Sequence, residues 1–490
     1  MNRTQTRKLL AIALLAVAAT AAAAGGVLRV AVPYNVNTLD PHGSNALDLG
    51  TVSVARNVFD SLVVRGATGF EPALAASWSN PDPTTWVFTL REGVTFHDGS
   101  PFTAEDVRAT IAHVVEQAGP AAPLFAPVTV TTRGDLEVVM TTEAPLGTML
   151  VNLTRLWIGP AERIGDEAFR MLPVGTGPFV VTEYVVDDRI SLRANEDYWG
   201  GRPSLDGIEM LRIPELSSRL TALTTGEIDL TWLIPSDQLP ELEANREIVV
   251  TSVPSYGSYV LWFNSGREPF TDARVRRAVW HAIDYATIID ALYQGVGVAA
   301  QGPVTPAVFG FVPQEPYAYD PDLARQLLTD AGYPDGFVTS IMWANPAYSD
   351  LSYAIVSDLA RVGITVDPLL KEHAIWLQDL LALEFDMNNM VQSAANGDAD
   401  ILLGRLYLCA NKRTGYCSEE LDALLLAARA ETDQEARLEL YAQASAIIWG
   451  EALGMFPIDV LATYALRTHV TGFQPDPAQT PSFYSVELGR

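Results

Sequence analysis

The segment Trp86-Val87-Phe88-Thr89-Leu90-Arg91-Glu92-Gly93-Val94-Thr95-Phe96-His97-Asp98-Gly99 carries the strongest structural signal in the chain. Its first part, 86–91, is rich in β-branched and aromatic residues, which favour a strand. Gly93 can adopt a positive φ, and 94–96 returns to the strand pattern. The sequence therefore predicts a β-hairpin closed by residues 91–93.

A helix signal follows directly. Thr103 and Asp106 have the spacing of a capping box, in which two side chains satisfy backbone N–H groups at the start of a helix. Beyond them, Val107, Ile111 and Val114 recur at helical spacing and would form a buried stripe.

Strand and helix signals alternate along the rest of the chain, which predicts an α/β fold. With 490 residues the chain is too long for one compact core, so we expect two or more lobes. The expected strands are 27–32, 128–132, 137–141, 179–184, 190–194, 209–213 and 259–264. Further helices are expected at about 217–225, 271–283, 321–331, 418–431 and 436–448.

The composition limits the possible partners. Hydrophobic residues make up 48% of the chain and charged residues 19%, which is typical of a globular protein. The formal net charge of −27 argues against nucleic acid as a partner, because phosphate binding needs a basic surface. Copies of so negative a protein repel one another, which keeps the protein dispersed, so we expect a monomer.

Residues 1–24 have the layout of a secretory signal peptide. The positive charges of Arg3, Arg7 and Lys8 precede an apolar run at 9–24, which ends in small residues suited to cleavage. An uncleaved membrane anchor is the alternative, but the run is shorter than the roughly 20 residues that span a bilayer comfortably. We therefore expect export to the periplasm.

The chain has 2 cysteines, Cys409 and Cys417. In an oxidising compartment such a pair favours a disulfide, which would stabilise the fold by about 2–3 kcal/mol through its short loop. Two free buried thiols are the alternative. A metal site needs more ligands than this pair, so we expect no metal and no cofactor.

A secreted hydrolase is the main rival class. The sequence has no H-E-x-x-H metal motif, no G-x-S-x-G nucleophile elbow and no phosphate-binding G-x-x-x-x-G-K-[ST] loop. Its histidines are scattered, and His42 and His373 are too isolated in sequence to suggest a metal site. The abundant carboxylates leave an acid/base pair open, although a solvated surface explains them better. We expect no enzymatic activity.

Five groups of residues follow one another over nearly the whole chain. The most specific group is the segment 86–99 together with Pro101–Val107. The others are Leu39-Asp40-Pro41-His42, Gly175–Phe179 with Asn195–Trp199, Pro269–Ala278 with Ala282–Asp284, and Asp320–Ala324 with Ala331–Tyr333. In this order the five groups resemble the solute-binding proteins of ABC importers in family 5, which serves dipeptides, oligopeptides and nickel.

The resemblance implies a two-lobed periplasmic-binding-protein fold, class II-like, that closes on its ligand about a hinge. The expected boundaries are lobe 1 at 25–258 plus 468–490, an extra subdomain of lobe 1 at about 46–164, lobe 2 at 264–465, and hinge segments at about 258–264 and 465–468.

The resemblance also points to a pocket that lacks the charged anchors of dipeptide binding. Dipeptide-binding relatives are expected to hold the peptide amine with an Asp and its carboxylate with an Arg, because both charges of a buried zwitterion must be paired. Aligned from Asn396–Asp400 and from Asn345-Pro346, these positions fall on Ala395 and Met342. A free dipeptide held by its two ends is therefore not expected.

The pocket positions are instead polar-neutral, apolar and aromatic. The candidate ligand-binding residues are Asn45, Met342, Trp343, Ala344, Gln392, Ser393, Ala394 and Ala395, with Tyr256, Tyr259 and Trp262 as second-tier candidates near the hinge. For Trp343, ordinary core packing is the alternative. We expect the protein to capture a peptide or peptide-like solute and to deliver it to a membrane permease; a sugar or other non-peptide solute is the alternative cargo.

Overall fold

The structure is a computed structural model that describes residues 25–66 and 69–489. The signal peptide expected at 1–24 lies outside the described residues. Among those that are described, no helix combines the length and the apolar character needed to cross a membrane.

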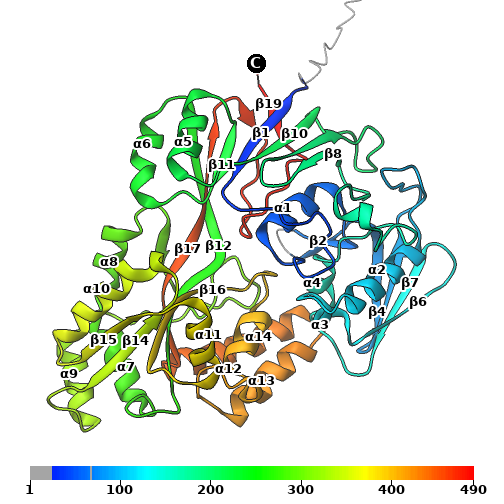
Figure 1. Cartoon of the computed structure of the whole chain (residues 1–490). Helices are drawn as coiled ribbons and strands as arrows, with labels where there is room; N and C mark the ends of the chain where they lie inside the picture. Colours follow the sequence, from blue (N-terminus) through cyan, green and yellow to red (C-terminus); the bar gives the residue numbers. More distant parts are fainter. Residues whose placement is uncertain (1–24, 67–68, 490) are drawn as a thin grey trace, which may run out of the picture.

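An 11-stranded mixed sheet runs through both halves of the molecule (Figure 1). Its order is β15-β14-β16-β12-β17-β11-β1-β10-β9-β8, with β13 paired to β17. The antiparallel partners β12 (Ile248–Phe263) and β17 (Gly454–Arg467) are its longest strands, at 16 and 14 residues. The other strands are β1 (Val27–Val32), β8 (Phe179–Val185), β9 (Arg189–Ala194), β10 (Gly207–Arg212), β11 (Leu230–Trp232), β13 (Gly297–Ala299), β14 (Val338–Trp343), β15 (Thr365–Leu370) and β16 (Met387–Ser393).

The buried hydrophobic residues form separate clusters on the two halves of this sheet, so β12 and β17 connect two lobes. Lobe 1 contains the clusters built around β1, β10 and β11, and lobe 2 contains the cluster built around β14 and β16. On β17, Ile458 packs in lobe 2 and Ala462 packs in lobe 1. β17 therefore passes from the core of lobe 2 to the core of lobe 1 at 458–462, and we call this point the changeover. It lies earlier in the chain than the hinge expected at 465–468. The sequence does not mark it, because the apolar pattern of the strand continues across it.

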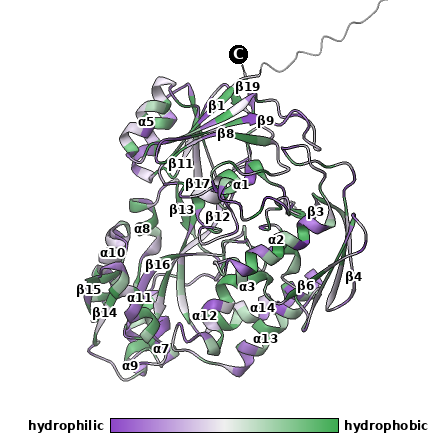
Figure 2. Cartoon of the chain, turned by 45° about the vertical axis from the view of Figure 1, so that its right-hand side comes forward, coloured by the Kyte–Doolittle hydropathy of each residue, from purple (hydrophilic) through white to green (hydrophobic). Residues whose placement is uncertain are grey.

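Helices cover both lobes. In lobe 1 these are α1 (Leu49–Val58), α5 (Leu216–Thr225) and α6 (Leu239–Ala244). In lobe 2 they are α7 (Ala273–Ala282), α8 (Tyr285–Leu292), α9 (Pro321–Asp330), α10 (Ser349–Ala360), α11 (His373–Ala382), α12 (Arg405–Tyr407), α13 (Glu419–Ala430) and α14 (Gln434–Gly450). Figure 2 shows hydrophobic and hydrophilic residues mixed along these helices, as helices with one buried face require.

A subdomain with its own core extends from lobe 1. Its buried cluster runs from Ala46 to Ile158 and packs under a 4-stranded sheet of order β4-β5-β7-β6. Its elements are β4 (Ala75–Asp82), β5 (Thr85–Leu90), β6 (Val128–Thr132), β7 (Glu137–Thr142), α2 (Ala104–Glu116), α3 (Ala122–Phe125) and α4 (Met149–Leu153). Two small ribbons, β2 (Val63–Arg65) with β3 (Phe70–Pro72) and β18 (Val470–Thr471) with β19 (Glu487–Leu488), complete lobe 1.

The hairpin predicted at 86–96 is wrong, whereas the helix start is confirmed. β5 pairs with β4 and β7, and residues 94–102 close a turn of their own in which the Phe96 N–H donates to the Ser100 carbonyl at 2.8 Å. Local sequence could not show that β7 occupies the position beside β5. The Thr103–Asp106 capping box is present, and it starts α2 as expected.

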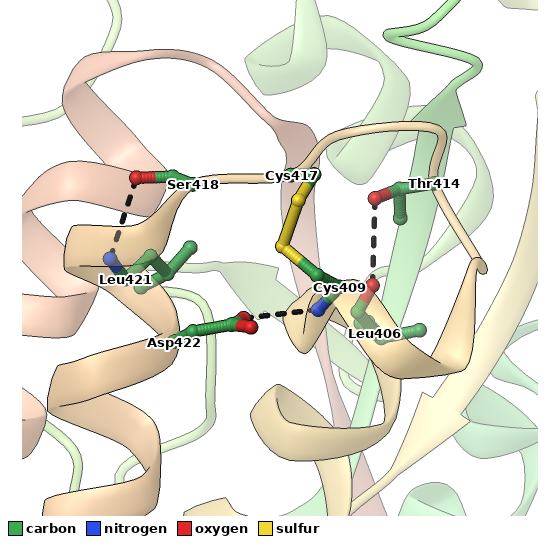
Figure 3. The surroundings of a disulfide bond; sticks show 7 residues. All are labelled: Leu406, Cys409, Thr414, Cys417, Ser418, Leu421 and Asp422. Carbon is green, nitrogen blue, oxygen red and sulfur yellow. Dashed lines mark hydrogen bonds between the residues drawn. A yellow bond between two sulfur atoms is a disulfide. The ribbon is translucent and has the colours of Figure 1, made fainter.

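The disulfide predicted between Cys409 and Cys417 is present (Figure 3). Their Cα atoms lie 4.8 Å apart, and the bond closes the loop between α12 and α13. The Cys409 N–H also donates to Asp422 Oδ1 at 2.9 Å, which ties the same loop to α13.

Removing this disulfide is expected to cost about 2–3 kcal/mol of unfolding free energy, because the unfolded chain regains the freedom of the loop. The measurement is urea unfolding of a Cys409→Ser/Cys417→Ser double variant against the oxidised parent. The reduced parent serves as the control and should match the variant. A loss below about 0.5 kcal/mol would contradict the expectation.

Candidate ligand-binding site

Two adjoining cavities lie between the lobes, with volumes of about 240 and 360 Å³. Both are lined by Val52, Arg155, Tyr256, Ala395 and Thr480, so we treat them together as the interlobe cavity. Ala395 follows β16 in lobe 2, Tyr256 belongs to the crossing strand β12, and the other three residues belong to lobe 1 and its subdomain. The cavity is thus walled by both lobes.

Helix α1 supplies one wall. Val52 and Arg56 are one turn apart on this helix and both line the cavity. The helix is held close to the preceding loop at Gly50, where a Cβ atom would lie only 2.3 Å from the Asn35 carbonyl oxygen. Glycine is therefore required there for the close packing that positions the wall.

The subdomain and lobe 2 touch directly. Arg155 Nη1 donates a hydrogen bond to the carbonyl of Ala395. Elsewhere the Gly147 N–H donates to the Arg429 carbonyl at 2.8 Å, and a Cβ atom at Gly147 would lie 1.8 Å from the Glu431 carbonyl oxygen. These contacts place the two walls of the cavity within reach of one ligand.

Three guanidinium groups line the cavity: Arg56, Arg65 and Arg155. Burial lowers the pKa of Arg155, and the nearby charge of Arg56 lowers it further. Burial raises the pKa of the Tyr256 phenol, while the charges of all three arginines act in the opposite direction. One hydroxyl group therefore lies within the field of all three cations.

Asp60 is the carboxylate that lines this cavity among the described residues. It accepts hydrogen bonds from Trp199 Nε1 at 2.8 Å, Thr176 Oγ1 at 2.9 Å and the Tyr198 hydroxyl at 3.0 Å. All three donors are neutral, and burial raises the pKa of the Asp60 carboxyl. Neutral donors of the protein itself therefore satisfy the Asp60 carboxylate oxygens.

Three residues expected from the sequence line the interlobe cavity: Ser393, Ala395 and Tyr256. Ala394 lies between the first two but is buried, and its N–H donates to the Tyr256 carbonyl at 3.0 Å. Gln392 is also buried, and its side-chain oxygen accepts a hydrogen bond from Arg405.

The expected residues of β14 lie elsewhere. Met342 and Trp343 are buried in the core of lobe 2, and Ala344 packs against the same core. Trp343 Nε1 donates to Ser349 Oγ at 3.1 Å, so its polar atom is also satisfied within the lobe. These residues do not line the interlobe cavity. Successive side chains of β14 point to opposite faces of the sheet, and lobe 2 covers both faces at this end of the strand.

The remaining candidates are placed apart from one another. Asn45 is half-buried and donates to Asp48, outside the lining of the cavity. Trp262 is buried in lobe 2. Tyr259 lines a groove of about 770 Å³ between the lobes, where Tyr293 is its ring partner at 4.9 Å.

The interlobe cavity is a better candidate for the ligand site than this larger groove. Neither Arg56 nor Arg155 lines the groove. The hydrogen bond that joins the subdomain to lobe 2 lies at the interlobe cavity and not at the groove. When the lobes close about β12 and β17, we expect the interlobe cavity to narrow, because the subdomain and lobe 2 already touch on that side.

Trp343→Ala is expected to lower the free energy of unfolding by about 3–5 kcal/mol, because it leaves a large void in the core of lobe 2. Ligand affinity of the folded protein should change little. Chemical unfolding and calorimetric titration check the two statements, with the exposed Leu381→Ala on α11 as the control. A large loss of affinity without loss of stability would instead support ligand contact by Trp343.

His42 is not isolated, contrary to expectation. Its Nδ1 lies 3.0 Å from Asp40 Oδ1 and its Nε2 lies 2.7 Å from the Trp157 carbonyl oxygen, while His113 lies beside it. The three side chains could supply metal-ligating atoms, but both ring nitrogens of His42 already have partners. The group therefore ties the loop after β1 to the subdomain.

Sequence reasoning did not point to Arg56, Arg65 or Arg155. The three positions are far apart in the chain and share no motif. One signal was available: Arg56 interrupts the small and apolar segment 49–58 in a strongly acidic protein.

Comparison with known proteins supports this architecture. Residues 69–414 match the model for bacterial extracellular solute-binding proteins, family 5 Middle. The chain is 29% identical over 477 residues to heme-binding protein A of Haemophilus influenzae, which covers 89% of this chain and 87% of that protein. It is 29% identical over 504 residues to the glutathione-binding protein GsiB of Escherichia coli K12, with 98% of each covered.

A solved structure is similar as well. The ABC transporter-associated periplasmic binding protein DppA from Helicobacter pylori, in complex with the peptide STSA, has a TM-score of 0.76 and 28% identity, covering 95% of this chain and 98% of that one. The match to the family model spans more than half of this chain. The chain therefore belongs to the bacterial extracellular solute-binding proteins of family 5 and has their two-lobed fold.

Proposed function

We propose that this protein captures a peptide or peptide-like solute in the interlobe cavity and delivers it to the membrane permease of an ABC importer. The observation that carries the proposal is a cavity walled by both lobes at the strands that join them. The similarity to a glutathione-binding protein and to a periplasmic binding protein in complex with a peptide supports the choice of cargo.

Ligand capture would proceed by hinge closure. Two strands cross between the lobes, and their pairing is irregular between Pro254 and Ser258, where the ladder offers least resistance to bending. A ligand that contacts Tyr256 and Arg155 on one wall and Ser393 and Ala395 on the other binds best when the lobes are closed. Its differential affinity for that state shifts the population towards it.

The rest of the proposal follows from this role. No bond is broken, so we propose that the protein is not an enzyme. It would work as a periplasmic monomer whose macromolecular partner is the permease, and its net charge of −27 is unsuited to nucleic acid. We propose the boundaries expected from the sequence, lobe 1 at 25–258 plus 468–490 and lobe 2 at 264–465, with one change. Because β17 passes between the two cores at 458–462, lobe 2 ends at about 458 and lobe 1 resumes at about 462.

A thermal-shift screen tests the function, because a ligand that binds only the folded state raises the melting temperature. The screen would use peptides of about two to five residues, oligosaccharides and metal–chelator pairs, together with mass spectrometry of any solute released on denaturation. We expect peptides to raise the melting temperature. A shift by oligosaccharides alone would replace the cargo, and no shift with no released solute would overturn the proposal.

A further inference from the structure

The arginines of the interlobe cavity are short of anionic partners. Arg56 Nη2 lies 3.6 Å from Asp476 Oδ1, a long ion pair. Within residues 25–66 and 69–489, no carboxylate lies within 4 Å of the Arg65 or Arg155 guanidinium, and Arg65 Nη2 is buried without a hydrogen-bond partner. Arg65 Cζ lies over the Phe70 ring at 5.3 Å, which does not supply a hydrogen-bond acceptor. An acceptor group on a ligand would therefore be stabilised at this buried guanidinium nitrogen.

The carboxylate in the cavity does not neutralise these charges. Asp60 is occupied by Thr176, Tyr198 and Trp199, as described above. Its neighbouring cation is Arg91, which lies over the Trp199 ring at 4.4 Å. Asp476, the partner of Arg56, also acts on Tyr256 and Arg155 and offsets one of the three cationic charges. The side of the cavity that holds Tyr256 therefore keeps an excess of positive charge, inside a protein whose formal net charge is −27.

The partners of Arg155 leave room for a ligand. Its Nη1 donates to a neutral acceptor, the Ala395 carbonyl. A guanidinium presents five N–H donors in a planar fork that fits a carboxylate in a bidentate manner. Arg155 can thus keep its contact with lobe 2 and still bind an acidic group.

From this arrangement we infer that the interlobe cavity selects solutes that carry at least two acidic groups, one for Arg65 and one for Arg155. The inference rests on the proposed solute-binding function and adds the charge class of the cargo. Val64, Tyr256 and Tyr484 in the same lining are exposed or half-buried and supply apolar surface for the body of such a solute. Negative net charge of the protein does not oppose this selection, because the field within a cavity is set by the groups that line it.

Matched peptide pairs test the inference. Each pair has the same length and shape and differs only in charge, as in Glu-Ala-Glu against Gln-Ala-Gln, with Lys-Ala-Lys as the cationic counterpart and lengths of about two to five residues. We expect the acidic members to bind at least about tenfold more tightly in calorimetric titrations. Any solute released from the purified protein should carry two or more acidic groups.

Three variants separate recognition from folding. Arg65→Gln and Arg155→Gln should each reduce the preference for the acidic peptide about tenfold, while Arg155→Lys, which keeps the charge but loses the fork, should retain part of it. Arg133→Gln is the matched control, because Arg133 is 67% exposed and pairs with Glu137 in the subdomain. Melting temperatures without ligand confirm that each variant is folded.

The outcomes distinguish the two proposals. Amide or lysine peptides that bind as tightly as the acidic ones, or a preference unchanged in both arginine-to-glutamine variants, would overturn the charge class and leave the solute-binding function standing. If no peptide of any charge binds and no solute is released on denaturation, both proposals fail.

Discussion

Replacing Arg437 with methionine will lower the free energy of unfolding by about 3–5 kcal/mol, because it leaves the carboxylate of Asp398 buried without its counter-charge. Both side chains are 1% exposed, and Arg437 Nη1 and Nη2 donate to the two Asp398 oxygens at 2.6 and 2.8 Å. Arg437 also donates to the Ala428 carbonyl and the Tyr441 hydroxyl. No other pair in the described chain combines such burial with bidentate geometry.

Chemical unfolding measures this loss, and the neighbouring pair provides the control. Arg429 and Asp400 are 38% and 17% exposed, so Arg429→Met should cost only about 1 kcal/mol or less. A double variant that replaces both Arg437 and Asp398 with apolar residues should recover much of the stability, because no buried charge remains. Equal losses in the two methionine variants would contradict the argument.

The same variant should weaken ligand binding. The Asp398 N–H donates to Asn396 Oδ1 at 3.1 Å, and Asn396 and Ala395 line the interlobe cavity. The ion pair thus holds the loop that forms the lobe 2 wall. A folded Arg437→Met protein with unchanged affinity would show that this loop keeps its shape without the pair.

Asp459→Asn will stabilise the protein by about 2–3 kcal/mol above pH 6, because the parent must then bury an ionised carboxylate. Asp459 is 2% exposed, burial raises its pKa to about 6, and its hydrogen-bond donor is the Ser258 hydroxyl at 2.8 Å. The residue lies on β17 at the changeover between the lobes. An uncharged amide avoids the cost of burying the ionised carboxylate.

The pH dependence follows from the direction of this shift. Between about pH 4 and pH 6 the unfolded chain has released the Asp459 proton while the folded chain still holds it. The contribution of Asp459 to the free energy of unfolding therefore falls as the pH rises through this window and is constant above it. His97 has the opposite effect, because burial lowers its pKa to about 4.

The difference between variant and parent isolates Asp459 from His97. Unfolding free energies measured from pH 4 to pH 8 should show a variant advantage that grows up to pH 6 and then levels off. Asp367→Asn, at an exposed position of β15, is the control and should give a flat difference near zero. An advantage that is already full at pH 4 would contradict the assigned pKa.

The fold could be predicted from the sequence where local chemistry decides it. The Thr103–Asp106 capping box and the Cys409–Cys417 bond form between residues close in the chain, and both are present. The hairpin predicted at 86–96 is absent because β5 lies between β4 and β7, and β7 follows α2 and α3 in the chain. Strand partners that are distant in sequence leave no mark in a local pattern.

The candidate site was harder to predict for the same reason. The segment 393–395 was reached by alignment from Asn396–Asp400, and two of its residues line the interlobe cavity. Met342 was identified in the same way, but lobe 2 covers both faces of β14 at this point and buries it. The arginines Arg56 and Arg155 meet only after α1 and the subdomain have packed together, so their proximity is a property of the tertiary fold.

The path of β12 and β17 also sets an order of assembly. The core of lobe 1 begins at Leu28 and ends at Val486, whereas the core of lobe 2 lies wholly between Val260 and Ile458. Lobe 2 can complete its core before the end of the chain has been made, while lobe 1 must wait for Phe483 and Val486. During synthesis or passage through a membrane, the half that appears first is therefore the half that finishes last.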